Sequence, residues 1–183
     1  MKVVGVVGMP ASGKSEAARL ARDEDVPVVT MGDVIRDEVE RRGLEPTDEN
    51  MGRVATELRE EEGDDAVARR CADEIRAKEA PVVVVDGLRS DDEADYFRDE
   101  FDDGDAFVLV AVDAPFETRL ERVRDRDRDD DMATADELRD RDDRELGYGM
   151  GDAIEDADVR IQNDGSLDEF REGFRSVLTE ESQ

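Results

Sequence analysis

An eight-residue segment near the amino terminus has the residue types and the spacing of a phosphate-binding loop. Two glycines allow its backbone to wrap with the N–H groups pointing inward, and the helix that follows adds its positive end at the same place. A lysine in this position bridges the β- and γ-phosphates of a nucleotide, and the next hydroxyl ligates Mg²⁺. We expect ATP with Mg²⁺, or GTP in its place, to contact the whole segment, which consists of Gly8, Met9, Pro10, Ala11, Ser12, Gly13, Lys14 and Ser15.

Two further segments place an acid and an arginine three residues apart after short apolar runs. The Asp33 carboxylate can cap a helix, while Arg36, one turn on, points its guanidinium at the phosphate of an acceptor. Asp86 follows four valines and would emerge beside the phosphate loop, where a carboxylate can hold a water on Mg²⁺ and Arg89 can face the acceptor. Simpler roles stay open, namely a cap alone for Asp33, a surface ion pair with Glu40 for Arg36, and a strand-ending turn for Asp86.

A stretch rich in arginine follows the fourth apolar run. Arg119, Arg122 and Arg126 fall on one helical face, where the repulsion between like charges would be offset by a bound polyphosphate. Acids alternate with these arginines, so a solvated helix with many ion pairs is the alternative. We expect residues 119–131 to form a charged helix and a mobile loop.

These segments resemble the small-molecule kinases of the adenylate kinase and dephospho-CoA kinase group. The stretch from Gly32 to Arg36 is similar to the G-D-x-x-R sequence that opens the acceptor-site helix of nucleoside monophosphate kinases. The stretch from Asp86 to Arg89 is similar to the end of the third strand in adenylate kinases, although Leu88 stands where they have a proline. The stretch from Val112 to Arg122 is similar to the V-x-A-P-x-x-x-R-x-x-R pattern of dephospho-CoA kinases. Overall, the sequence resembles an archaeal family of small P-loop kinase-like proteins.

The resemblance implies roles for particular residues. Arginines of the 119–151 region would sit on a lid over ATP, with Arg122 binding the nucleotide and Arg126 acting in catalysis. The turn at Asn163 would approach the adenine, with a simple turn-forming role as the alternative. Lys14 and the lid arginines would hold the γ-phosphoryl group as charge spreads in the transition state, while Asp33 or Asp86 orients the acceptor.

The elements that must position these residues alternate between strand and helix. Nearly pure apolar runs predict buried parallel strands at residues 3–7, 27–30, 81–85, 106–112 and 159–162. Helices are expected between them, the second opening at Asp33, with a helical acceptor-binding insertion at 32–79 and a flexible stretch around residues 147–151. Reciprocal caps are predicted at the pairs Ser90 with Glu93, Thr134 with Glu137, and Ser166 with Glu169. The sequence therefore predicts one domain over residues 1–183, a three-layer α/β P-loop sandwich with sheet order 2-3-1-4-5.

Composition narrows the function classes. The 26 basic and 54 acidic residues give a net charge of −28, which disfavours nucleic acid and anionic membranes as partners. With no histidine and one cysteine, imidazole catalysis and internal disulfides are excluded. Only three of the basic residues are lysine, and this acidic, arginine-biased style resembles proteins of salt-loving archaea. No apolar stretch approaches the roughly 20 residues of a membrane span, so we expect a cytoplasmic protein, as a monomer or homodimer.

Two functions from different classes remain. The first is an ATP- and Mg²⁺-dependent phosphotransferase acting on a nucleotide-like small molecule, such as a nucleoside monophosphate or dephospho-CoA. The second is an ATP-binding regulatory or assembly protein with slow hydrolysis. Acceptor-side arginines that face a pocket would favour the kinase, whereas arginines bound in surface ion pairs would favour the regulatory protein. Nucleotide hydrolysis as the main activity lacks an identifiable water-positioning residue.

Overall fold

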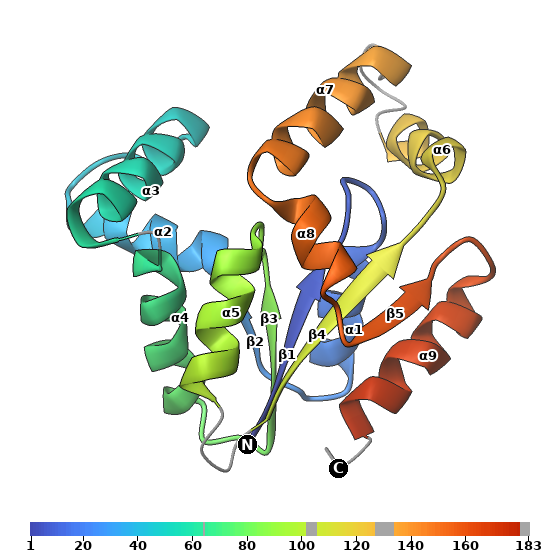
Figure 1. The fold of residues 1–183 in the computed structure, drawn as a ribbon, viewed down its shortest axis with the longest axis horizontal. Coiled ribbons are helices and arrows are strands. Elements are labelled where there is room, and N and C mark those ends of the chain that lie inside the picture. Colours follow the sequence, from blue (N-terminus) through green and yellow to red (C-terminus); the bar gives the residue numbers. More distant parts are fainter. Residues whose placement is uncertain (64, 102–105, 127–133, 180–183) are drawn as a thin grey trace.

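The computed structural model describes residues 1–63, 65–101, 106–126 and 134–179. Its centre is a five-stranded parallel sheet in the order β2-β3-β1-β4-β5, as the sequence predicts (Figure 1). The strands are β1 (Lys2–Val7), β2 (Val28–Thr30), β3 (Val82–Asp86), β4 (Ala106–Asp113) and β5 (Val159–Gln162). Because all five are parallel, their carboxyl ends share one edge, and ligands of such sheets bind there.

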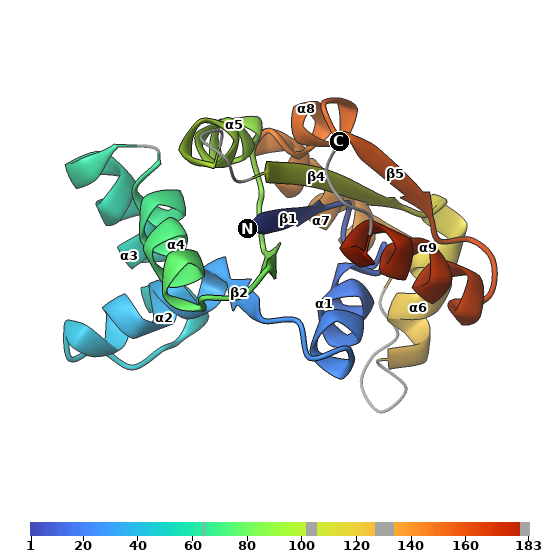
Figure 2. The same ribbon diagram turned by 90° about the horizontal axis from the view of Figure 1, so that it is seen from below.

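Alternating valines give each strand two buried faces. Val4 and Val6 of β1 pack with α1 (Lys14–Asp23) and α9 (Leu167–Thr179), while Val3 and Val7 point into the opposite cluster. That second cluster lies under α4 (Ala66–Ala77), α5 (Asp91–Glu100) and α8 (Met150–Glu155). Figure 2 shows helices on both sides of the sheet, which confirms the three-layer arrangement. Two-sided burial explains why the strands read as apolar runs rather than as alternating patterns.

The predicted insertion consists of α2 (Met31–Arg41), α3 (Asp48–Glu62) and α4, between β2 and β3 (Figure 1). The expectation that the second helix opens at Asp33 is wrong. Thr30 occupies the N-cap position without a side-chain cap hydrogen bond, so Asp33 lies inside the first turn of α2. Strand β2 runs directly into the helix, and the chain therefore turns helical two residues earlier than the acid indicates. Thr47 caps α3, accepting a hydrogen bond from the Asn50 N–H.

The three predicted reciprocal caps do not all form in the same way. Thr134 and Glu137 exchange both bonds at the start of α7 (Ala135–Gly147), and the corresponding pair opens α9. At α5, Ser90 accepts from the Glu93 N–H, but the Glu93 carboxylate takes the N–H of Arg89 instead of that of Ser90. Its other oxygen accepts a hydrogen bond from Arg59 of α3 at 3.1 Å. A residue far away in the sequence therefore competes with the Ser90 N–H for the Glu93 carboxylate.

Helices α6 (Phe116–Arg126) and α7 follow β4 above the carboxyl edge of the sheet, and α8 then packs on the face of the sheet beside α5 (Figure 1). Val123 of α6 and Leu138 of α7 are buried against each other with Ala11 of the phosphate loop beside them. The flexible stretch expected at residues 147–151 is wrong in part, because α8 begins at Met150, which is buried. The expected loop at residues 127–131 and the side chain of Arg126 lie outside the described residues.

Candidate nucleotide-binding site

The phosphate loop takes a shape that only glycine permits at its last turn. Gly13 has φ +124°, and a Cβ atom placed there would lie 2.1 Å from the Nδ2 atom of Asn163. At the loop's other end, a Cβ on Gly8 would lie 2.4 Å from the Val112 carbonyl oxygen. A turn bond from the Ser12 N–H to the Met9 carbonyl closes the loop at 3.1 Å. The glycine spacing of the motif is thus a consequence of close backbone packing against β4 and β5.

Lys14 lies inside this loop and is held by it. Its Nζ atom donates to the Gly8 carbonyl at 2.5 Å and to the Met9 carbonyl at 3.2 Å. Burial lowers the pKa of Lys14 below its usual value, while the nearby carboxylates of Glu145 and Asp86 act in the opposite direction. A partly desolvated ammonium among carbonyl oxygens and carboxylates is a ready partner for phosphate oxygens.

The remaining loop residues fit a magnesium nucleotide. The Ser12 hydroxyl is buried and has no hydrogen-bond partner among the described residues, while Ser15 at the start of α1 is exposed and open to a ligand. Asp86 pairs in register with Val6, so its carboxylate ends β3 next to the strand that leads into the loop. Burial raises the pKa of Asp86, and Lys14 partly counteracts this. No group of three or more acidic or cysteine side chains suited to a metal occurs among the described residues, so Mg²⁺ would also need oxygen atoms from phosphate or water.

Two arginines of α6 insert into the carbonyl side of the loop. Arg119 is 6% exposed, donates to the Pro10 carbonyl at 3.1 Å, and forms two 2.7 Å bonds with Asp142 of α7. Arg122 donates to the Ser12 carbonyl at 2.9 Å and to the backbone oxygen of Asn163 at 2.6 Å. The predicted arginine face therefore exists and points at the loop. Its guanidinium groups donate to backbone carbonyls of the loop, and the contact of Arg122 with nucleotide stays a prediction.

Asn163 is also brought to the phosphate loop. It follows β5, is 6% exposed, and donates from its side-chain amide to the Ser12 carbonyl at 2.7 Å. Its Oδ1 atom accepts a bond from Arg122 at 3.2 Å. In this structure the amide fixes the loop's backbone, and the role near adenine stays a prediction.

The acceptor side has a different character. Asp33 and Arg36 form an ion pair with each other on the surface of α2, both side chains being at least half exposed. The alternative partner, Glu40, is therefore not the one used. Arg89 is 57% exposed, and its Nη1 atom lies 3.8 Å from Glu145 of α7. The structure thus places Asp86 and Arg89 near Lys14 of the phosphate loop, and each acceptor-side arginine has a carboxylate partner. The contact of Arg89 with the acceptor stays a prediction.

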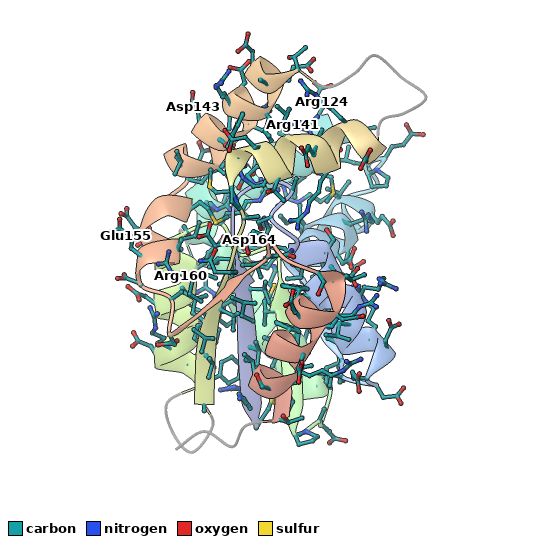
Figure 3. All side chains as sticks on the ribbon, turned by 90° about the vertical axis from the view of Figure 1, so that its right-hand side faces the viewer. Arg124, Arg141, Asp143, Glu155, Arg160 and Asp164 are labelled. Atoms are coloured by element: carbon teal, nitrogen blue, oxygen red, sulfur yellow. The ribbon has the colours of Figure 1, made fainter. Side chains whose placement is uncertain are left out.

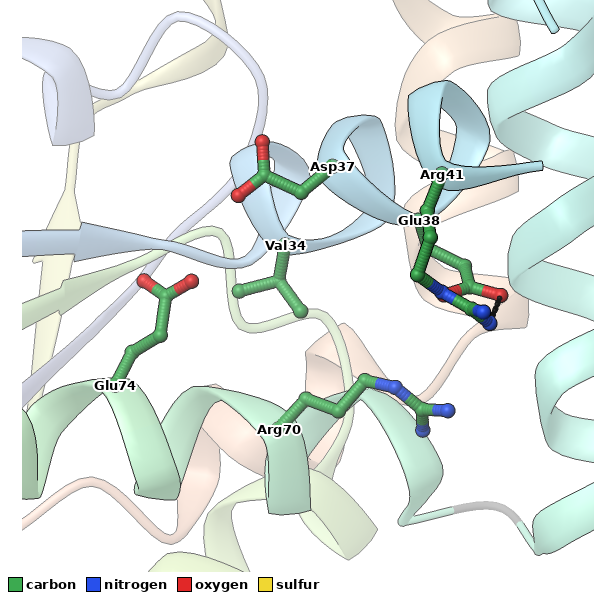
Figure 4. A pocket seen from close by; sticks show the side chains of 6 residues that line it. All are labelled: Val34, Asp37, Glu38, Arg41, Arg70 and Glu74. Atoms are coloured by element: carbon green, nitrogen blue, oxygen red, sulfur yellow. Dashed lines mark hydrogen bonds and ion pairs between the residues drawn. The ribbon is translucent and has the colours of Figure 1, made fainter. Parts of the chain in front are cut away.

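An open cavity of about 230 Å³ lies between α2 and α4, on the inserted helices (Figure 4). Asp37 and Glu74 point toward its interior, and Arg41 at its rim is bonded to Glu38. None of the residues predicted to bind nucleotide or acceptor lines it. The cavity therefore belongs to the predicted acceptor-binding insertion at 32–79 but contains none of the individually predicted site residues.

Three functional candidates were missed by sequence reasoning: Asp142, Glu145 and Glu93. The first two lie one helical turn apart on α7 and face the phosphate-loop cations, whereas Asp143 between them is exposed (Figure 3). The sequence signal for this pair is that two acids stand three residues apart on a predicted helix, but many acids of this chain have the same spacing. Glu93 had been recognised only as a local cap.

Comparison with known proteins agrees with this geometry. Residues 7–139 match a family described as AAA domain. A UPF0200 protein of Methanosarcina acetivorans is 54% identical over 178 residues, covering 97% of this chain and 94% of the relative. The chain belongs to the UPF0200 family. A further UPF0200 protein, from the halophile Halobacterium salinarum, is 50% identical over 180 residues and covers 97% and 93% of the two chains.

Several solved structures of other proteins have the same fold as this UPF0200 protein. TT1252 from Thermus thermophilus superposes with a TM-score of 0.69 at 21% identity, covering 99% of this chain and 98% of the other. A shikimate kinase from Bacteroides thetaiotaomicron (TM-score 0.56, 15% identity, 96% and 95% covered) is also similar. So is a gluconokinase from Sinorhizobium meliloti (TM-score 0.53, 19% identity, 97% and 93% covered). The P-loop fold of small-molecule kinases is therefore shown.

Within the described residues, no helix is both long enough and apolar enough to span a membrane.

Proposed function

We propose that this UPF0200 protein is an ATP- and Mg²⁺-dependent phosphotransferase that acts on a nucleotide-like small molecule. The observation that carries the proposal is the position of Lys14, Ser15 and Asp86 together at the carboxyl edge, with inserted helices on the acceptor side. The kinase titles of structures with the same fold support it. The motif resemblance to dephospho-CoA kinases and nucleoside monophosphate kinases supports an acceptor of that type.

Each residue has a task in the proposed reaction. The loop N–H groups and the amino end of α1 would bind the β-phosphate, and Lys14 would leave the Gly8 and Met9 carbonyls to bridge phosphate oxygens. Ser15 and, through a water, Asp86 would hold Mg²⁺, which neutralises charge on the phosphates when bound. Asp33 and Arg36 would receive the acceptor, with Arg89 beside them. The work of these groups is positioning and charge neutralisation.

One observation favours a second candidate, the ATP-binding regulatory or assembly protein. Arg36 is paired with Asp33, and Arg89 has Glu145 within ion-pair range. Arginines engaged in this way on an exposed surface offer less positive charge to an acceptor. A protein whose nucleotide state changes these pairs would need no acceptor at all.

The test measures ATP consumption by the purified protein in molar KCl with Mg²⁺, in the presence of nucleoside monophosphates or dephospho-CoA. We expect one acceptor to be phosphorylated, activity to disappear in Lys14→Ala, and activity to survive in Lys78→Ala. Lys78 is a suitable control because it is exposed at the end of α4. Tight ATP binding without turnover stimulated by any of these acceptors would contradict the kinase proposal and support the regulatory protein.

A further inference from the structure

Helix α7 directs two carboxylates toward the cations around the phosphate loop. Asp142 is 13% exposed and bonded to Arg119, and Glu145, one turn later, is 22% exposed. Both belong to a helix that is otherwise covered with exposed charges. Asp142 and Glu145 therefore lie on the side of α7 that faces the loop, unlike the exposed charged residues of the same helix.

The two carboxylates have different partners. Asp142 is satisfied by two short bonds with a buried arginine, so it has a structural role. Glu145 lies 3.8 Å from the Arg89 guanidinium, within ion-pair range but beyond hydrogen-bond distance. Its negative charge also raises the pKa of Lys14, against the effect of burial. Glu145 therefore adds negative charge near both cations, at a distance from Arg89 that is too long for a hydrogen bond.

The phosphate groups of the proposed reaction need the same two cations, Lys14 for the nucleotide and Arg89 for the acceptor. Lys14 is desolvated inside the loop, and an anion near it lowers its free energy. When phosphate arrives, a carboxylate in the same neighbourhood becomes a like charge and repels it. Phosphate and the Glu145 carboxylate therefore compete for Lys14 and Arg89.

We propose that Glu145 is a built-in competitor of the nucleotide phosphates, which balances the charges of Lys14 and Arg89 in this structure and must move away when nucleotide binds. This inference rests on the proposed binding of ATP at the phosphate loop. It holds for either a kinase or a regulatory protein. In both, it makes the position of α7 depend on the occupancy of the loop.

The experiment compares ATP binding by wild type, Glu145→Gln and Asp143→Asn, using titration calorimetry in molar KCl with Mg²⁺. Glutamine keeps the shape of the side chain and removes its charge. Asp143→Asn removes an equal charge from the exposed side of the same helix (Figure 3). We expect Glu145→Gln to bind ATP about tenfold more tightly, which corresponds to about 1.4 kcal/mol, and Asp143→Asn to stay within about twofold of wild type.

Inorganic triphosphate is the second probe, because it carries the phosphates without base or sugar. The same gain in Glu145→Gln with this probe is expected if the competition is for the phosphate cations. Unchanged or weaker ATP binding in Glu145→Gln, in a protein that unfolds at the wild-type temperature, would overturn the inference. Wild-type protein that binds neither ATP nor triphosphate would instead contradict the proposed function, so the two failures are distinguishable.

Discussion

The two sides of the phosphate loop hold their arginines in opposite ways. On the nucleotide side, Arg119 and Arg122 insert into the structure and donate to backbone carbonyls of the loop. On the acceptor side, the Arg36 and Arg89 side chains are 50% and 57% exposed, and their partners are other side chains. Backbone carbonyls are fixed by the fold, whereas exposed ion pairs exchange readily with solvent and ligands. The nucleotide side is therefore preorganised, and the acceptor side can rearrange when a ligand arrives.

The inserted helices themselves contain both fixed and exposed charge pairs. Glu38 of α2 is 6% exposed and accepts bonds from both Arg41 and Arg42, while Arg42 also reaches Glu57 of α3. This charge network around the buried Glu38 carboxylate joins α2 to α3, while the Arg41 side chain is exposed. The insertion is thus rigid where its helices meet and adaptable at Asp33 and Arg36, on another part of α2.

The largest expected effect comes from breaking the buried pair that ties α6, α7 and the loop together. Arg119→Met leaves the Asp142 carboxylate, 13% exposed, without its two bonds and should reduce the free energy of unfolding by about 3 kcal/mol. Denaturant unfolding in molar KCl measures it. The double variant Arg119→Met with Asp142→Asn should recover part of the loss, because no charge is then left unpaired. Additive losses would show that the two residues do not act as a pair.

A buried charge in the inserted helices should give the next largest effect. Hydrogen bonds from Arg41 and then Arg42 lower the pKa of Glu38 from 4.5 to about 2. The folded-state pKa is depressed, so the ionised carboxylate stabilises the fold above about pH 4.5, and this contribution is lost as the pH falls toward 2. Glu38→Gln should therefore cost about 2 kcal/mol at pH 7, and much less at pH 2.

Acid titration of unfolding for wild type and Glu38→Gln measures this difference. Glu40→Gln is the matched control, because Glu40 is exposed on the same helix. A gap between wild type and Glu38→Gln that stays constant from pH 7 to pH 2 would contradict the proposed charge network.

The fold follows from the sequence more completely than the site does. Nearly pure valine runs determine which segments are buried on both faces, and the glycine spacing of the loop reflects contacts that forbid a Cβ. The roles of Asp142, Glu145 and Glu93 could not be predicted, because each has a partner far away in the chain. In a sequence that is 44% charged, acids at helical spacing from arginines are common, and spacing alone does not identify those that face inward.

A smaller effect is expected from the arginine that joins the loop to the turn after β5. Lysine cannot reproduce the fork with which Arg122 contacts the Ser12 carbonyl and Asn163 together. Arg122→Lys should weaken ATP binding about fivefold, close to 1 kcal/mol, because the loop is then less well ordered before the nucleotide arrives. Arg124→Lys, on the exposed side of α6, is the control and should bind ATP like wild type (Figure 3). Equal affinities in both variants would remove the case for preorganisation by Arg122.

The smallest effect on stability, and the sharpest contrast between the two sides, belongs to Arg36. Its ion pair with Asp33 is exposed, so Arg36→Ala should change the free energy of unfolding by less than about 0.5 kcal/mol and leave ATP affinity unchanged. If the protein is a kinase for a phosphate-bearing acceptor, the same variant should raise the KM for that acceptor about tenfold with little change in kcat, because the lost ionic contact binds the acceptor equally in the ground state and the transition state. Arg53→Ala, an equally exposed arginine on α3, is the control. An unchanged acceptor KM in Arg36→Ala would mean that the Arg36–Asp33 ion pair is only a surface contact. Arg89 would then be the remaining candidate for binding the acceptor.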